Sequence, residues 1–349
     1  MTASFRLPRG LAALAGVGGV ATIAIAVAAA FIAASGVDPW HAFSVMAAHA
    51  LGSADGLLEV LVRAIPFTIA GLGIVVAFRV NAFNIGADGQ IIVGAIAAVW
   101  LATALPDLAG WLLAPLFLIA GFVAGGLFGG FAGWLRARYN ASEIITTIML
   151  NYVAIQLLGH LVRGPLQEAM RIMPQSERVP DSVVFDILID GSRVHAGLIL
   201  AVLLTALFWG LKRLTAFGYS LHAVGSNPAA ARYGGIDDRR VLTLAMALSG
   251  AMAGLAGAVE IAGLHHRLQE NFAPGFGITA IAVGLLARLN PLLVPAMAVL
   301  FGVLHVGSGA MQREAAVPLP IVWVIEGVVI LAFLVYGRLR PGSASTAAG

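Results

Sequence analysis

The stretch "RVNAFNIGADGQIIVGA", residues 79–95, decides how this chain folds because it places polar residues between two long apolar runs. Asn81, Asn84, Asp88 and Gln90 alternate there with glycines. Polar groups at membrane depth are costly, so they usually face a cavity, a partner or the interior of a helix bundle. Glycines allow a broken helix to present its backbone, which is tolerable only where protein or water covers it. The stretch therefore marks an interruption between two apolar helices.

Two interpretations of this stretch remain open at the sequence level. In the first, it re-enters the membrane between two spans, and its amides line a path for a solute. In the second, it is a cytoplasmic loop in which Asn84 and Asp88 cap helices and the glycines end them.

The composition around this stretch is that of a membrane protein. The chain has 349 residues, of which 60% are hydrophobic and 11% charged, and its mean hydropathy is +0.95. These values exceed what a water-soluble domain of this length shows. We therefore expect an all-α polytopic membrane protein in which residues 1–349 form a single transmembrane domain. The net charge of +3 comes from scattered basic residues without interleaved aromatics, which argues against nucleic acid as a partner.

Apolar runs long enough to cross about 30 Å of hydrocarbon recur along the chain. We predict ten spans, at residues 11–34, 57–79, 90–105, 111–135, 144–162, 195–211, 241–262, 276–289, 292–311 and 319–337. The first follows Arg6 and Arg9 but exceeds the 7–15 apolar residues of a signal peptide, so we interpret it as an uncleaved span.

The distribution of basic residues predicts the orientation. With the N-terminus in the cytoplasm, thirteen lysines and arginines lie inside and six outside, with Arg63 within a span. An excess of positive charge marks the cytoplasmic side. Both termini, including a tail at 338–349, are then cytoplasmic. Ten spans would divide into five and five, so any internal repeat would be inverted in the membrane.

Glycines in two spans predict close helix packing. Gly121, Gly125, Gly129 and Gly133 recur every four residues, and Gly250 and Gly254 do the same in a later span. Such stripes let helix backbones approach one another closely.

The loop at 212–240 carries the signals of a short surface helix. Asn227 can cap it, Pro228 suits its first position, and Gly234 with Gly235 ends it. A helix this short is marginal in water, so we expect it to pack on a partner or on the membrane face.

Five segments together resemble a known family. They are "NAFNIGADGQIIVGA", "ASEIITTIMLNYVA", "GSNPAAARYGGI", "ALSGAMAGLAGAVEIAG" and "GFGITAIAVGLLARLNP". In this order, over residues 57–337, they resemble the permease subunits of ABC transporters for ribose-type sugars, branched-chain amino acids and nucleosides. The simple-sugar and nucleoside branch is the most similar.

The resemblance implies a role and a set of partners. The turn from Gly225 to Ile236 would be the coupling helix that docks on the ATP-binding subunit, and Asn227, Ala230, Tyr233 and Gly234 match its motif positions. Further implied partners are a second permease chain, the same or related, and a periplasmic or lipid-anchored binding protein above the lipid bilayer of a bacterial inner membrane. The resemblance implies nucleosides or simple sugars as solutes, moved by alternating access, with branched-chain amino acids as the alternative.

The residues themselves exclude an ATPase on this chain and give no sign of an enzyme. A phosphate-binding loop needs a Gly-Lys pair, and the one lysine, Lys212, follows Leu211. No cysteine is present, and the histidines show no metalloenzyme spacing, so we expect no metal and no cofactor. The alternative class is a self-sufficient secondary transporter or channel, for which Glu260 and Glu326 are the candidate acidic residues.

Amide and aromatic side chains are the candidates for the solute path, because they suit a neutral hydroxylated solute. The candidates are Phe83, Asn84, Gln90, Asn151, Tyr152 and Asn290. Phe83 and Tyr152 could stack on a ring, although aromatic residues in a bundle also serve as plain packing.

Overall fold

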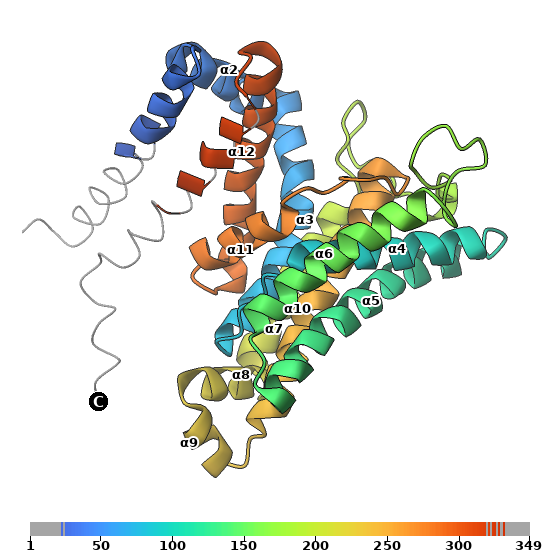
Figure 1. The fold of residues 1–349 in the computed structure, drawn as a ribbon, viewed down its shortest axis with the longest axis vertical. Helices are drawn as coiled ribbons and strands as arrows, with labels where there is room; N and C mark the ends of the chain where they lie inside the picture. Colours follow the sequence, from blue (N-terminus) through green and yellow to red (C-terminus); the bar gives the residue numbers. More distant parts are fainter. Residues whose placement is uncertain are drawn as a thin grey trace, which may run out of the picture. The chain divides into compact units, whose positions relative to one another are not determined.

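The computed structural model describes residues 22–331, except 24, 319, 322, 326, 329 and 330. Within this part of the chain all long elements are helices (Figure 1). These are α2 (Pro39–Leu51), α3 (Ala54–Arg79), α4 (Ala87–Ala104), α5 (Gly110–Tyr139), α6 (Glu143–Val162), α7 (Gly197–Leu214), α8 (Ala216–Ser226), α9 (Pro228–Tyr233), α10 (Asp238–Glu260), α11 (Phe276–Leu286) and α12 (Val294–Glu314), with short 3-10 helices at Asp181–Val183 and Pro291–Leu293 and a π-helix at Ile261–His265.

The chain forms two compact units. The first comprises the residues up to 57 and those from 303 onward, and the second is Leu58–Gly302. In the first unit, the helix Ile25–Ala34 and α2 meet at a bend of 118°. Gly36, with φ of +83°, lies in the turn between them. Ile32, Ala42 and Met311 are fully buried in the core of this unit.

The second unit is organised around α10, which packs on α5 and α4, while α4 also packs on α6 (Figure 1). The two glycine stripes predicted from the sequence face each other. A side chain at Gly125 would collide with the carbonyl oxygen of Gly250, and one at Gly254 would collide with that of Gly121. The backbones of α5 and α10 therefore touch directly, which confirms the predicted close packing.

Seven of the described helices are long and apolar enough to cross a membrane, or eight if the bent pair at Ile25–Leu51 counts as one span. They correspond to the predicted spans 57–79, 90–105, 111–135, 144–162, 195–211, 241–262 and 292–311. Much of the predicted spans 11–34 and 319–337 lies outside the described residues. The inverted repeat and the orientation of the termini stay predictions.

The predicted span 276–289 is a shorter element than expected. Helix α11 has 11 residues. At 1.5 Å per residue it extends only about 17 Å, which is too short to cross the hydrocarbon alone. It stops because Arg288 and Leu289 both adopt left-handed backbone conformations, with φ of 52°. Expecting a complete span here was therefore wrong.

Candidate functional site

Asn84 and Gln90 form a buried amide pair at the break between α3 and α4. Asn84 Nδ2 donates to Gln90 Oε1 at 2.8 Å, and Gln90 Nε2 donates to Asn84 Oδ1 at 2.9 Å. Asn84 Nδ2 also contacts Ser249 Oγ on α10 at 2.9 Å, and Gly86 N–H donates to Asn84 Oδ1 at 3.1 Å. Both side chains are at most 1% exposed. In this conformation the two amides therefore satisfy each other inside the bundle.

Asn151 of α6 caps the start of α4 from outside the helix. Its Oδ1 accepts from Gly89 N–H at 2.8 Å, and its Nδ2 donates to the carbonyl oxygen of Ile85 at 2.9 Å. The N-cap residue of α4 is Gly86, which has no side chain to do this. The first amides of a helix have no partner within it, so a side chain from α6 supplies one.

Asp88 caps a second helix start in the same way. Its Oδ1 accepts from the N–H of Gly277, in the first turn of α11, at 2.7 Å. The N-cap residue of α11 is Gly275, which has a φ of +73°. A side chain at Gly277 would collide with the backbone N of Asp88, so only glycine permits this approach. The two broken helices therefore begin next to each other, joined through the Asp88 carboxylate.

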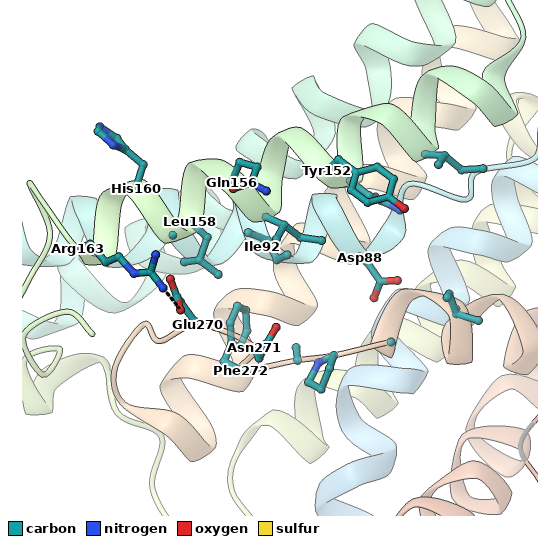
Figure 2. A pocket seen from close by; sticks show the side chains of 18 of the residues that line it. Asp88, Ile92, Tyr152, Gln156, Leu158, His160, Arg163, Glu270, Asn271 and Phe272 are labelled. Atoms are coloured by element: carbon teal, nitrogen blue, oxygen red, sulfur yellow. Dashed lines mark hydrogen bonds and ion pairs between the residues drawn. The ribbon is translucent and has the colours of Figure 1, made fainter. Parts of the chain in front are cut away.

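A cavity of about 1070 Å³ opens beside these helix starts (Figure 2). It is lined by the first turns of α4, by one face of α6, and by residues 270–275 and 278. Asn151 and Tyr152 are among the lining residues, as are Gln156, Asp88 and the ion pair between Arg163 and Glu270 at 3.0 Å.

The other four candidates for the solute path lie outside the lining of this cavity. Asn84 and Gln90 are in the buried amide pair. Phe83 is 45% exposed and packs edge-on against Phe78. Asn290 caps the short 3-10 helix after α11, where its Oδ1 accepts from Leu292 N–H at 3.4 Å. Sequence patterns did not predict that Asp88 would contact the start of α11, because its partner Gly277 is 189 positions away.

The short helix predicted in the 212–240 loop is present as α9. Asn227 Oδ1 accepts from the N–H groups of Ala229 and Ala230 at 3.0 and 3.1 Å. Gly234 N–H closes the helix on the carbonyl oxygen of Ala230, and Ile236 N–H donates to that of Ala231, both at 3.0 Å. The side chain of Tyr233 is 96% exposed, so α9 presents an aromatic ring to its surroundings. Helix α8, which precedes α9, was not predicted.

The region of α8 and α9 is hydrogen bonded directly to the broken segment before α4. Asn81 Nδ2 donates to the carbonyl oxygen of Gly225, at the end of α8, at 2.8 Å. The Gly225 Cα lies so close to the carbonyl oxygen of Arg79 that any side chain would collide with it. Arg136 of α5 donates to the Asn81 carbonyl at 2.9 Å and pairs with Glu143 of α6 at 2.6 Å. Helices α5 and α6 and the α8–α9 region therefore converge on this segment.

The loop at 163–196, which connects α6 to α7, is stabilised by hydrogen bonds to Glu168. Its carboxylate accepts from Gln175 Nε2 at 2.7 Å and from Met173 N–H at 3.1 Å. The hydrogen bond from Gln175, with smaller contributions from Met173 and Arg267, holds the pKa of Glu168 below its ordinary value. This loop is thus ordered by a charged residue at the surface.

The long apolar helices, the cavity between them and the short exposed helix together define a multi-pass membrane transport protein. Residues 56–334 match the family described as "Branched-chain amino acid transport system / permease component", and the chain belongs to this family. The resemblance drawn from the five sequence segments is thereby confirmed.

Curated relatives extend over most of the chain. A glucose ABC transporter permease protein from Haloferax volcanii is 39% identical, with 96% of this chain and 88% of the relative covered. A guanosine ABC transporter permease protein from Bacillus subtilis is 35% identical over 78% of this chain and 79% of its own. A nucleoside ABC transporter permease protein from Lactococcus lactis is 33% identical over 85% and 84%. No solved structure is significantly similar to the chain.

Proposed function

We propose that this chain is the membrane-spanning permease subunit of an ATP-driven importer for a neutral hydroxylated solute, a nucleoside or a simple sugar. The names of the relatives support this solute class. The cavity supports it as well, because Asn151 and Gln156 offer amide donors and acceptors and Tyr152 offers a ring face. The proposal gives the chain no covalent chemistry, and a separate ATP-binding subunit hydrolyses ATP.

We also propose that the chain works together with partner proteins. We place the chain in the cell membrane as one single transmembrane domain, paired with a second permease chain and served by a substrate-binding protein. Alternating access then moves the solute, as ATP binding and hydrolysis by the partner shift the bundle between two states. Gly225, Asn227, Ala230, Tyr233, Gly234 and Ile236 form the coupling element in this proposal.

The observation that carries the proposal is the hydrogen bond from Asn81 to the Gly225 carbonyl. It connects the α8–α9 region to the segment that starts α4, whose Ile85 and Asp88 line the cavity. A displacement of α9 by a docked subunit would therefore act on the cavity wall through a few direct contacts.

The alternative function, a self-sufficient secondary transporter or channel, is not supported by a comparable contact. Glu260, one of its two acidic candidates, lies 3.4 Å from Arg63 and 3.4 Å from His265. Its carboxylate is thus engaged in a buried charge network. Glu326, the other candidate, lies outside the described residues.

The first experiment measures ATP-dependent uptake of guanosine, glucose and leucine by the chain reconstituted with its partner subunits. We expect guanosine or glucose to be carried. Uptake of leucine alone would instead favour the amino acids named in the family description, and full uptake without ATP or partners would contradict the proposal.

The coupling role is tested with Tyr233→Ala. Tyr233 is 96% exposed, so we expect its removal to leave the melting temperature of the purified chain unchanged. If the ring inserts into a groove on the ATP-binding subunit, its loss should lower uptake at least about tenfold, since buried aromatic anchors contribute on the order of 2 kcal/mol. Trp111→Ala, which removes an 80% exposed ring at the start of α5, is the matched control. Normal coupled uptake in Tyr233→Ala would show that α9 does not dock through this residue.

A further inference from the structure

The cavity contains one carboxylate that has no cationic partner in the described part of the chain. Arg163 and Glu270, which also line it, form an ion pair with each other at 3.0 Å. Asp88 accepts from backbone N–H groups at the start of α11, from Gly277 at 2.7 Å through Oδ1 and also from Ile278. Because Arg163 and Glu270 offset each other, Asp88 is the one carboxylate on the cavity wall without a counter-charge among the described residues.

The Asp88 carboxylate has room for further hydrogen bonds. An ionised carboxylate offers about four acceptor sites on its two oxygens, and the backbone bonds from Gly277 and Ile278 leave about two of them free. The residue is half-buried, and Figure 2 shows its side chain reaching from α4 into the cavity. A group with free acceptor sites at the wall of a cavity is suited to a ligand that donates, and sugar hydroxyls are such donors.

We propose that Asp88 is a specificity-determining residue that accepts hydrogen bonds from hydroxyl groups of the solute in this cavity. The inference rests on the proposed function and deepens it, because it names the group that recognises the solute. Carboxylates bind sugar hydroxyls in the same manner elsewhere, as on the ribose of dinucleotides. The uncompensated negative charge also disfavours solutes that carry a phosphate or carboxylate. Neutral polyols are thus selected over anions.

The position of Asp88 ties recognition to the arrangement of the helices. The same carboxylate holds the start of α11 against α4, through a contact that only Gly277 permits. A hydroxyl that binds Asp88 competes with, or adds to, the Gly277 N–H. Binding of the solute therefore changes the hydrogen bonding of Asp88 at the contact between the starts of α4 and α11.

The inference is tested by thiol labelling. The chain has no cysteine, so a single introduced cysteine is the one thiol of this chain that a maleimide can label. Ile155→Cys places a single thiol on the cavity wall, where the native side chain is 45% exposed. In the assembled complex without ATP, the rate of maleimide labelling is measured against increasing guanosine or glucose. The concentration that halves the rate reports solute binding in the cavity, independently of the binding protein. Ile92→Cys, also on the wall, is a second reporter.

The variant Asp88→Asn keeps an oxygen for Gly277 but removes the charge. We expect the half-protecting concentration to rise about tenfold, because charge-assisted hydrogen bonds are roughly twice as strong as neutral ones. Asp107→Asn, the same change in an exposed loop outside the cavity wall, should leave it unchanged.

Deoxy analogues separate recognition from a structural role. Guanosine is compared with its 2′-, 3′- and 5′-deoxy forms, and glucose with its 2-, 3- and 6-deoxy forms. In the unmodified Asp88 chain, at least one analogue should protect about tenfold less well, and in Asp88→Asn this loss should largely disappear. If the deoxy analogues lose protection equally in the unmodified chain and in Asp88→Asn, the inference is overturned. It is also overturned if the complex carries guanosine or glucose with ATP but neither solute slows the labelling of Ile155→Cys or Ile92→Cys. If no ATP-dependent uptake of any solute occurs, the proposed function itself fails, whatever the labelling shows.

Discussion

Polar side chains at the start of α4 each complete a hydrogen-bonding requirement that the broken helix leaves open. Asn84 is hydrogen bonded to Gln90 and Ser249. Asn151 accepts a hydrogen bond from a backbone N–H in the first turn of α4, and Asp88 accepts one from the first turn of α11. Buried polar groups without partners are costly, so these residues are needed for the bundle to tolerate a break at this depth.

Asn84→Leu is expected to destabilise the folded chain because it leaves both Gln90 and Ser249 with unsatisfied buried groups. The cost should be about 2–3 kcal/mol in the free energy of unfolding. Denaturant titration of the purified chain in detergent measures it. Thr103→Val is the control, since Thr103 Oγ1 contacts only carbonyl oxygens of its own helix. An unfolding free energy that stays within about 0.5 kcal/mol in Asn84→Leu would contradict the buried pair.

The sequence predicted these residues as important but not their partners. Helix caps that use neighbouring residues, such as Asn227 for α9, follow local rules and were found at the correct positions. The partners of Asn84 and Asp88 on α10 and α11 are 165 and 189 residues away, and no local rule specifies them. For the same reason, the sequence predicted amides in the solute path, whereas the structure places a carboxylate beside Asn151 and Tyr152 on the cavity wall.

At the scale of elements, the backbones of α5 and α10 touch directly, and this contact depends on glycine on both sides. A Cβ at Gly129 would lie 2.7 Å from the carbonyl oxygen of Met246, and collisions with backbone follow at Gly125 and Gly254. The regular four-residue spacing predicted this packing, because the spacing alone places small residues on one helix face. Helix α2 was not predicted from the sequence. It begins with a local cap, Asp38 followed by Pro39, but it lacks the long apolar run that identified the other helices.

Gly254→Ala is expected to lower the free energy of unfolding by more than about 2 kcal/mol, because the added methyl group meets the backbone of α5. The matched control is Gly210→Ala in α7, where the nearest atom to a new Cβ would be a Leu214 methyl at 3.9 Å. That change should stabilise the helix by up to about 1 kcal/mol, since alanine is the better helix former. Equal melting temperatures for the two variants would show that the helices do not touch at Gly254.

For the whole molecule, the bias of basic residues predicts that the α8–α9 region is cytoplasmic and the 163–196 loop faces outward. In intact cells, Asp190→Cys should react with a membrane-impermeant maleimide. Ala229→Cys in α9 should react only after permeabilisation. The reverse pattern would invert the topology and remove the proposed docking of an ATP-binding subunit on α9.

The direct contact of the α5 and α10 backbones also limits how this protein can evolve. Every amino-acid substitution of a glycine introduces a larger side chain, so we expect substitutions along this face to be selected against. The side chains that line the cavity lie largely on α6, as at Ile148, Tyr152 and Ile155, outside this glycine face. New solute preferences can therefore arise at the cavity wall while the glycine face between α5 and α10 remains fixed.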